Sequence, residues 1–321
     1  MKNQPTVLCI VGPTATGKTA LSVEIARRYD GEIVSADAVA VYRGLDIGSA
    51  KPSKEEQSGI PHHMIDCVDL RDFDFTVSRF REAARNAIDG IIERNRLPIV
   101  VGGSGLYADA IFADMKFSAP SDPEIRAQLE KEYDADKTAV FERLRNFDPV
   151  TAQRLHPNDK KRVIRASEVY EITGTPFSQL NRAFETAQAG DQTYRVVRAG
   201  LNLDRKELYR RIEKRVDMMI ERGLQDEAYA LFEKGLTPDR YTSMQAIGYA
   251  QLYDAYMGRC TVEQAIEHIK LDTRHFAKRQ ITWFKRNRDT VWFDIQTTDR
   301  EEIIQRITEL LNENGRTNSN C

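Results

Sequence analysis

The segment GPTATGKT, residues 12–19, constrains the fold of this chain more than any other, and it directly follows the apolar run TVLCIV. Its spacing, G-x-x-x-x-G-K-T, is that of a loop whose backbone N–H groups surround phosphate oxygens. Such a loop lies between a buried strand and a helix, so that the positive end of the helix dipole faces the phosphate. The apolar run predicts the strand and KTALSVEIARRY predicts the helix. The segment therefore predicts a phosphate site at a strand end of an α/β fold.

Strands and helices continue to alternate after this loop. Apolar runs at 31–37 (GEIVSAD) and 97–103 (LPIVVGG) predict buried strands, and FTVSRFREAARNAIDGIIERN between them predicts an amphipathic helix. Continuously apolar strands are typical of a parallel sheet whose two faces are both covered by helices. We therefore expect an α/β fold with a P-loop NTPase-like parallel sheet, to which strands at 194–204 and 290–295 return.

Residues 122–192 show helical patterns and no convincing strand. This change predicts an all-helical domain inserted into a core formed by residues 1–121 and 193–321. Within that stretch, TAQAGDQT (186–193) predicts an exposed linker, and RTNSNC (316–321) predicts a frayed end of the chain.

Composition excludes several classes of protein. The four cysteines are scattered and form no C-x-x-C pair, so we expect neither a zinc site nor a disulfide framework. We expect a cytoplasmic protein without membrane attachment, because the chain has no apolar run of membrane-spanning length and no secretory pattern at residue 1. The net charge of −2 means that any binding of nucleic acid must depend on local clusters of cations.

Two polar residues follow the strands next to the phosphate loop. Ligands of parallel sheets collect at the carboxyl ends of the strands, where we expect Asp37 and Ser104. A nucleotide hydrolase usually has an acid at the end of its third strand, whereas this strand ends in two glycines. A carboxylate at Asp37 instead suits a substrate kinase or another group transferase. The alternatives are that Asp37 caps a helix and that Ser104 is only a turn residue.

The segments DIGSAKP (46–52) and IPHHMID (60–66) are expected to be loops. Adjacent side chains point in different directions, so His62 and His63 do not predict a paired metal site. Solvated loop histidines are favoured, with a phosphate or substrate contact as the alternative.

A cationic helix is predicted near the end of the chain. Residues 270–288 contain seven Lys and Arg but only one acid, Asp272. A helical repeat places the cations on one stripe and the apolar residues on another face, which we expect to pack on the core. With so few acids the stripe favours a polyanion over solvent, and a second basic cluster in the insertion adds to this prediction of nucleic-acid binding. The stripe is Lys270, Arg274, Lys278 and Lys285; the apolar face is Ile269, Phe276, Ala277, Trp283 and Phe284; the second cluster is Lys160, Lys161, Arg162 and Arg165.

These motifs occur together in one order along the chain: GPTATGKT, DAVAVYRGLDIGSAKP, PHHMID, GGSGLY, HPNDKKRVIRASEVYEITG, RIEKRV, QAIGY and AKRQITWFKR. In this the chain resembles the tRNA dimethylallyltransferase family, also called tRNA isopentenyltransferase, over residues 6–290. It resembles the bacterial type, because the C-terminal zinc finger of some eukaryotic members has no counterpart here.

The resemblance implies that the loop holds the pyrophosphate of dimethylallyl diphosphate, and that the five-carbon group goes to the exocyclic amine of the adenosine 3′ of the anticodon. It implies that Asp37 is the general base, that Ser104 contacts the reacting groups, and that Lys18 stabilises the leaving group with Mg²⁺ held by Thr19. The implied phosphate-binding set is Gly12, Pro13, Thr14, Ala15, Thr16, Gly17, Lys18, Thr19 and Arg215, with Arg211 as the alternative arginine.

The resemblance also implies a monomer that binds the anticodon stem-loop of tRNA. The expected contacts are Asp37, Ala38, Val39, Ala40, Ser104, Arg126, Lys161, Arg162, Arg165, Gln245, Gly248, Tyr249, Lys278, Arg279, Gln280, Trp283 and Lys285. Ala38 and Ala40 stand where many members have Ser and Gln, which affects the base contacts expected there but leaves Asp37 in place.

Three alternative functions remain open at this point. A small-metabolite kinase explains the loop and Asp37, but not the glycines at 102–103 or the cationic helix. Prenyl transfer to free adenine nucleotides leaves the basic segments without a role. A non-catalytic RNA-binding or nucleotide-sensing protein leaves the pairing of Asp37 with a phosphate loop unexplained.

Overall fold

The computed structural model describes residues 4–72, 75–112, 122–180 and 193–313. The chain divides into two compact units, one formed by residues 1–111 and 192–321 and the other by residues 112–191. The expected linker, apart from Thr193, and the expected frayed end fall outside the described residues.

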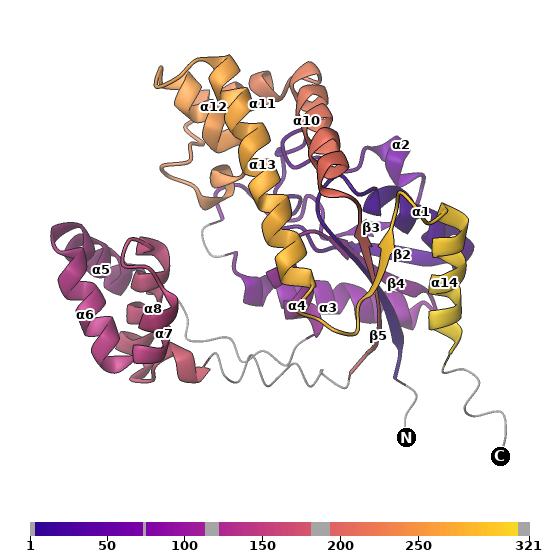
Figure 1. Ribbon diagram of the computed structural model, residues 1–321, viewed down its shortest axis with the longest axis horizontal. Helices are drawn as coiled ribbons and strands as arrows, with labels where there is room; N and C mark the ends of the chain where they lie inside the picture. Colours follow the sequence, from indigo (N-terminus) through magenta and orange to yellow (C-terminus); the bar gives the residue numbers. More distant parts are fainter. Residues whose placement is uncertain (1–3, 73–74, 113–121, 181–192, 314–321) are drawn as a thin grey trace. The chain divides into compact units, whose positions relative to one another are not determined.

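A six-stranded sheet forms the centre of the first unit, and all its described pairings are parallel. The strand order is β3-β2-β4-β1-β5-β6 (Figure 1). The strands are β1 (Thr6–Val11), β2 (Gly31–Ser35), β3 (His62–His63), β4 (Leu97–Gly102), β5 (Arg195–Asn202) and β6 (Val291–Asp294). Because β1 lies at the centre, the loop that follows it opens between the ends of β4 and β5.

Helices cover both faces of this sheet, which confirms the predicted fold class. Leu8 and Ile10 of β1 share one apolar cluster with residues of α1 (Lys18–Arg28) and α14 (Arg300–Asn312). Helix α3 (Val77–Glu93) packs on β2 and β4, and Figure 1 shows it with α4 (Gly105–Phe112) on the side away from α1. The buried residues of α3 recur every three or four positions, at Phe80, Ala84, Ile88 and Ile91, as an amphipathic helix requires.

A group of helices follows β5 in the first unit. It comprises α10 (Arg205–Glu221), α11 (Leu224–Glu233), the short 3-10 helix Thr242–Gln245, α12 (Tyr249–Tyr256) and the long α13 (Val262–Phe284), and α13 packs on both α10 and α12. The chain returns from α13 to the sheet through β6. A short helix, α2 (Lys54–Gln57), lies outside this group.

The second unit is helical throughout its described part. Its helices are α5 (Pro123–Ala135), α6 (Lys137–Phe147), α7 (Pro149–Arg154) and α8 (Lys160–Thr173). Aspartates cap their first turns: Asp122, Asp136 and Asp148 each accept hydrogen bonds from backbone N–H groups of the helix that follows. Buried residues of α5, α6 and α8 form its own apolar core.

One expected loop is partly a strand. His62 and His63 pair with Ile33 and Val34 of β2 as the edge strand β3. Two residues are too few to produce an alternating pattern, and the flanking Pro61 and Gly59 are typical of a loop. Within the described residues, no helix is both long enough and apolar enough to cross a bilayer.

Candidate active site at the carboxyl edge of the sheet

The phosphate loop lies between β1 and α1, as predicted. Gly12 has φ 142° and Gly17 has φ 79°, conformations that favour glycine. Gly12 also passes close to β5, since a Cβ there would lie 2.4 Å from the carbonyl oxygen of Leu201. Gly17 is the N-cap of α1 and leaves the first N–H groups of that helix open toward the loop.

Lys18 turns its ammonium group back over the loop. Its Nζ donates a hydrogen bond of 2.7 Å to the carbonyl oxygen of Pro13. Burial lowers the pKa of Lys18 to about 7; the positive charge of Arg215 lowers it further and the negative charge of Asp37 opposes this. An anionic phosphate beside this group would favour its charged form again.

The charges of Lys18, Asp37 and Arg215 act on one another, although these residues come from the loop, the segment after β2 and helix α10. Burial lowers the pKa of Arg215, while the negative charge of Asp37 raises it. Arg211, one turn earlier, forms an ion pair with Glu207, with a distance of 2.8 Å from Nε to Oε1. The electrostatics therefore favour Arg215 over Arg211 as the arginine of the phosphate site.

Asp37 follows β2 and is held by its own backbone turn. Its Oδ1 accepts hydrogen bonds from the N–H groups of Val39 (2.8 Å) and Ala40 (3.1 Å). Asp37 therefore does cap the turn that follows it, which is the alternative role that the sequence left open. The turn also fixes the carboxylate while leaving lone pairs of Oδ2 to accept a proton from a ligand.

Ser104 comes directly after β4 and lies beside the Asp37 turn. Its Oγ accepts a hydrogen bond of 3.0 Å from the N–H group of Ala38. Gly102 allows this approach, because a Cβ there would lie 2.1 Å from the carbonyl oxygen of Ala36. Gly102, which stands where a nucleotide hydrolase usually has an acid, thus allows the two strand ends to come together, and the Ser104 hydroxyl keeps its proton for donation.

The sequence prediction did not include Tyr107, on the first turns of α4. Burial is the main cause of its raised pKa, and the negative charge of Asp37 adds to it. Its ring packs on Phe80 at 4.3 Å between centroids. The GGSGLY motif contains this residue, but only the structure brings it within the field of Asp37.

Four residues expected to contact tRNA are buried: Ala40, Gly248, Tyr249 and Gln280. Tyr249 is 0 % exposed, and its hydroxyl donates a hydrogen bond of 2.5 Å to Glu227 of α11. The same carboxylate accepts bonds from the N–H groups of Asp46, Ile47 and Gly48. Tyr249 therefore helps to hold the 46–48 loop, with its ring packed inside the protein. Gln280 is 5 % exposed and also points inward.

The two adjacent histidines have structural partners, which corrects the expectation of solvated loop histidines. His63 Nε2 lies within hydrogen-bond distance of Glu32 Oε2, at 2.7 Å, and His62 Nδ1 lies 2.8 Å from the carbonyl oxygen of Ile60. Glu32 also pairs with Arg94 and Arg96. Hydrogen bonds from Arg94, then from His63 and Arg96, lower the pKa of Glu32 to about 2 despite the opposing effect of burial.

The cationic stripe of α13 divides into two halves. Lys270 pairs with Asp217 at 2.9 Å and Arg274 pairs with Glu213 at 2.6 Å, so acids of α10 neutralise its first half. The sequence could not place these acids, which come from a different helix. Lys278 and Lys285 are exposed, and no acidic side chain of the described chain lies in ion-pair range of them.

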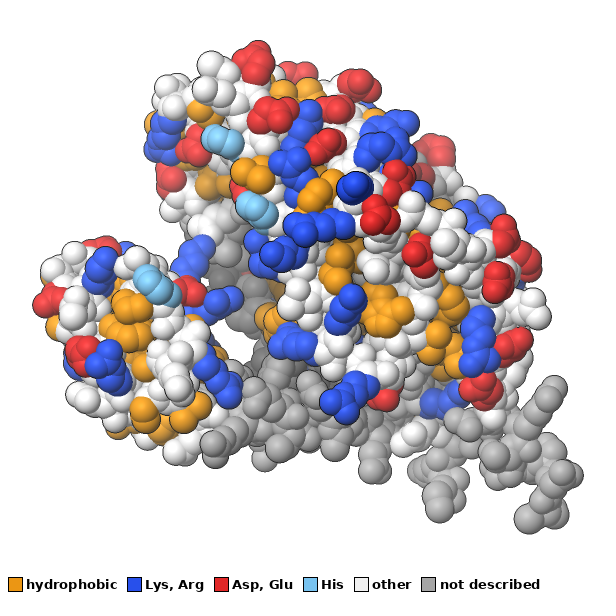
Figure 2. Space-filling view, in the orientation of Figure 1, with side chains coloured by type: hydrophobic (Ala, Val, Ile, Leu, Met, Phe, Trp, Pro, Cys, Tyr) orange, Lys and Arg blue, Asp and Glu red, His pale blue; other side chains and the backbone are white. Residues whose placement is uncertain are grey.

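Lys278, in the second half of the stripe, lines a hollow of about 530 Å³ together with His275, Arg279, Thr282, Trp283 and Arg286. The Arg286 guanidinium lies 3.9 Å from the ring centroid of Trp283. Figure 2 shows Lys and Arg side chains gathered on the face where α13 runs. Ile269, Ala277 and Phe284 pack inward as expected, whereas Phe276 and Trp283 remain partly exposed.

Two of the arginines that are expected to contact tRNA, Arg126 and Arg165, meet at buried Glu168 in the insertion. This carboxylate is 0 % exposed and accepts hydrogen bonds of 2.7 Å from both Arg126 and Arg165. Lys161 and Arg162 are exposed at the start of α8, where Arg162 pairs with Asp159. Glu168 thus brings together two arginines that are far apart in the sequence.

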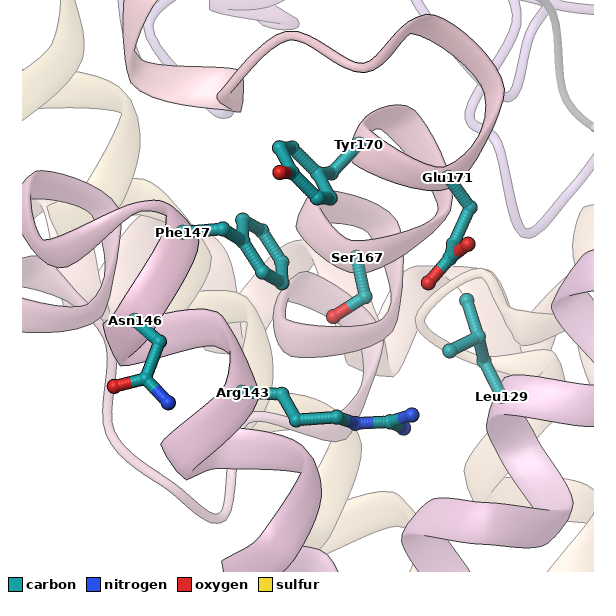
Figure 3. Close-up of a pocket in the computed structure, with 7 residues that line it drawn as sticks. All are labelled: Leu129, Arg143, Asn146, Phe147, Ser167, Tyr170 and Glu171. Atoms are coloured by element: carbon teal, nitrogen blue, oxygen red, sulfur yellow. The ribbon is translucent and has the colours of Figure 1, made fainter.

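The insertion has a cavity of its own, of about 420 Å³, between α5, α6 and α8 (Figure 3). The rings of Phe147 and Tyr170 stack there at 4.0 Å, and Arg143 and Glu171 line it as well. None of the residues expected to bind phosphate or to catalyse transfer lines this cavity.

The phosphate loop could hold Mg²⁺ with few ligands from the protein itself. The described residues contain no group of three or more His, Cys, Asp or Glu that could hold a metal ion. Mg²⁺ bound with a substrate diphosphate takes most of its oxygens from phosphate and water, so one hydroxyl suffices. Thr19 is exposed at the first turn of α1 and suits this role.

Together these features describe an α/β enzyme with a phosphate loop facing a carboxylate. Residues 40–287 match the model of the IPP transferase family. The chain is 44 % identical over 308 residues to a tRNA dimethylallyltransferase of Pelotomaculum thermopropionicum, covering 95 % of this chain and 96 % of that protein. It is 46 % identical over 293 residues to one of Desulforudis audaxviator, covering 91 % and 93 %.

Solved structures agree with these relatives. The full-length tRNA isopentenylpyrophosphate transferase of Bacillus halodurans matches with a TM-score of 0.71 and 39 % identity over 97 % of each chain. A eukaryotic dimethylallyltransferase acting on tRNA matches with a TM-score of 0.78 and 28 % identity, covering 96 % of this chain and 80 % of that one. The chain belongs to the IPP transferase family.

Proposed function

We propose that this enzyme transfers the dimethylallyl group of dimethylallyl diphosphate to the exocyclic amine of the adenosine 3′ of the anticodon in tRNA. The observation that carries the proposal is the mutual influence of Lys18, Arg215 and Asp37 at one edge of the sheet. Two cations suit a departing pyrophosphate, and a fixed carboxylate suits the proton of an attacking amine.

The phosphate loop would hold the diphosphate of the donor. As the bond between the allylic carbon and oxygen breaks, negative charge develops on pyrophosphate, where Lys18, Arg215 and the N–H groups at the start of α1 stabilise it. Thr19 would hold Mg²⁺, which would add positive charge beside the leaving group. Arg211 has no part in this scheme because Glu207 already engages it.

The adenine amine is a poor nucleophile that must lose a proton as its bond to the allylic carbon forms. Asp37 Oδ2 accepts this proton, while bonds from Val39 and Ala40 hold Oδ1. The Ser104 hydroxyl can donate to the adenine or to the diphosphate. The target base must leave its stack to reach these groups.

Cations of α13 and of the insertion would bind the anticodon stem-loop. Lys278, Arg279 and Lys285 form the exposed part of the first surface. Lys161, Arg162, Arg165 and Arg126 would form the second, so that the helical insertion expected at residues 122–192 would be a tRNA-binding domain. A monomer containing both surfaces would act in the cytoplasm, where its tRNA substrate is.

Labelled dimethylallyl diphosphate tests this proposal. Incubation with Mg²⁺ and bulk tRNA should place label in the tRNA and release pyrophosphate, whereas AMP should remain unlabelled. Lys18→Ala should nearly abolish transfer while the far-UV circular dichroism stays that of a folded protein. Efficient labelling of AMP would instead support transfer to free nucleotides, and phosphate transfer from ATP to a small molecule would support a kinase.

A further inference from the structure

Gln280 lies on α13, in a segment rich in exposed cations, yet both ends of its side-chain amide bind backbone next to the phosphate loop. Its Nε2 donates a hydrogen bond of 2.9 Å to the carbonyl oxygen of Gly103, and its Oε1 accepts one of 2.9 Å from the N–H group of Thr14. One side chain thus joins the loop after β4 to the phosphate loop after β1.

The GGSG segment leaves room for this connection. A Cβ at Gly103 would lie 2.2 Å from Gln280 Nε2, and a Cβ at Gly105 would lie 2.2 Å from the ring of Trp283. Trp283 Nε1 also donates a hydrogen bond of 2.7 Å to Asp109 of α4. The glycines after β4 therefore leave room for α13 to pack against the ends of the strands.

The hydrogen bond between Thr14 and Gln280 lies next to a strained residue of the phosphate loop. The next residue, Ala15, has φ 64°, a left-handed conformation that is unfavourable for residues other than glycine. Fixing the Thr14 N–H on Gln280 helps to hold this turn, and the hydrogen bond occupies an N–H group that would otherwise be open to a phosphate. The N–H groups that follow are thereby left to face the ligand.

We infer that Gln280 is a positioning residue of the pyrophosphate site, which shapes the phosphate loop without touching the ligand. The inference rests on the proposed function, because it takes the loop to bind the donor diphosphate. It separates Gln280 from the neighbouring Lys278 and Arg279, whose side chains face outward. The inner side of this turn of α13 then supports binding of the donor, and its outer side binds RNA.

Binding of inorganic pyrophosphate with Mg²⁺, measured by isothermal titration calorimetry, tests this role. Gln280→Met keeps the length of the side chain but removes both hydrogen bonds, so pyrophosphate affinity should fall about tenfold. The KM for dimethylallyl diphosphate should rise, while tRNA affinity should stay within about twofold of wild type. The matched control, Lys278→Met, should show the reverse: weaker tRNA binding and unchanged pyrophosphate binding.

A double-mutant cycle that combines Gly103→Ala with Gln280→Ala tests the same role even if Gln280→Met does not fold. Gly103→Ala should weaken pyrophosphate binding on its own, because its Cβ displaces the Gln280 amide. In a Gln280→Ala background it should add almost nothing, since the nearest remaining atom is the Gly12 carbonyl oxygen at 3.7 Å.

Full additivity in this cycle would overturn the inference, as would loss of tRNA affinity in Gln280→Met with pyrophosphate binding intact. A wild-type protein that binds no pyrophosphate would instead refute the proposed donor site. The two failures are therefore distinguishable.

Discussion

Neutralising Lys278 and Lys285 together should reduce the salt dependence of tRNA binding. Both side chains are exposed without an ion-pair partner in the described chain, so each is available to replace counterions on RNA phosphate. Each phosphate contact contributes about 0.7 to 0.9 to the slope of log affinity against log salt. Losing two contacts should flatten the slope by about 1.4 to 1.8. The affinity gap between wild type and Lys278→Gln/Lys285→Gln should then shrink about 7- to 12-fold between 50 and 200 mM salt.

The other half of the stripe provides the matched control. Lys270→Gln/Arg274→Gln removes the same formal charge from the same helix, but these cations already pair with Asp217 and Glu213. Fluorescence anisotropy of labelled tRNA at four or five salt concentrations measures both slopes, and calorimetry with pyrophosphate should give wild-type affinity for both double variants. Equal slopes for the two double variants would refute the argument that α10 divides the stripe into a neutralised half and an available half.

Three further predictions concern the site and its support. Asp37→Asn should lower kcat about 10²- to 10⁴-fold with little change in pyrophosphate affinity, because an amide cannot accept the proton of the amine; a loss confined to affinity would make Asp37 a ligand instead. Arg215→Ala should raise the KM for dimethylallyl diphosphate, whereas Arg211→Ala should leave it near wild type, and steady-state kinetics that reverse this order would contradict our assignment. Glu32→Gln should reduce the loss of folding stability at acid pH. The pKa of Glu32 is about 2, below its ordinary 4.5, so the ionised carboxylate contributes its full stabilisation above about pH 4.5 and loses it as pH falls toward 2. Thermal melts of wild type and variant across that pH range measure the difference.

The sheet was predictable because its strands are continuously apolar and the phosphate loop joins one of them to a helix. Thr6–Val11, Gly31–Ser35 and Leu97–Gly102 all lie within the runs that the sequence predicted. The short β3 was missed, since two histidines between loop residues carry no periodic pattern. Its position depends on pairing with β2 and on the Glu32 carboxylate, which are contacts between distant parts of the sequence.

From the sequence, only those site residues that directly follow a strand could be predicted. Asp37 and Ser104 follow their strands at the same edge, and the structure adds that the N–H group of Ala38 joins them. The choice between Arg211 and Arg215 could not be made from a helical sequence, because both lie one turn apart on α10. It depends on Glu207 engaging the first and on the charges of Lys18 and Asp37 acting on the second.

Helix α13 shows why a motif can be matched as a block while its residues do different things. Lys278, Arg279 and Gln280 are consecutive, but each step turns about 100° around the helix axis, so the third side chain faces inward when the first two face solvent. Charge patterning detects the outer side, since cations without acids are visible in the sequence. An inward amide that binds two backbone groups has no such signature; only the glycines at 103 and 105, which must stay small for α13 to fit, indicate from the sequence that something approaches closely there.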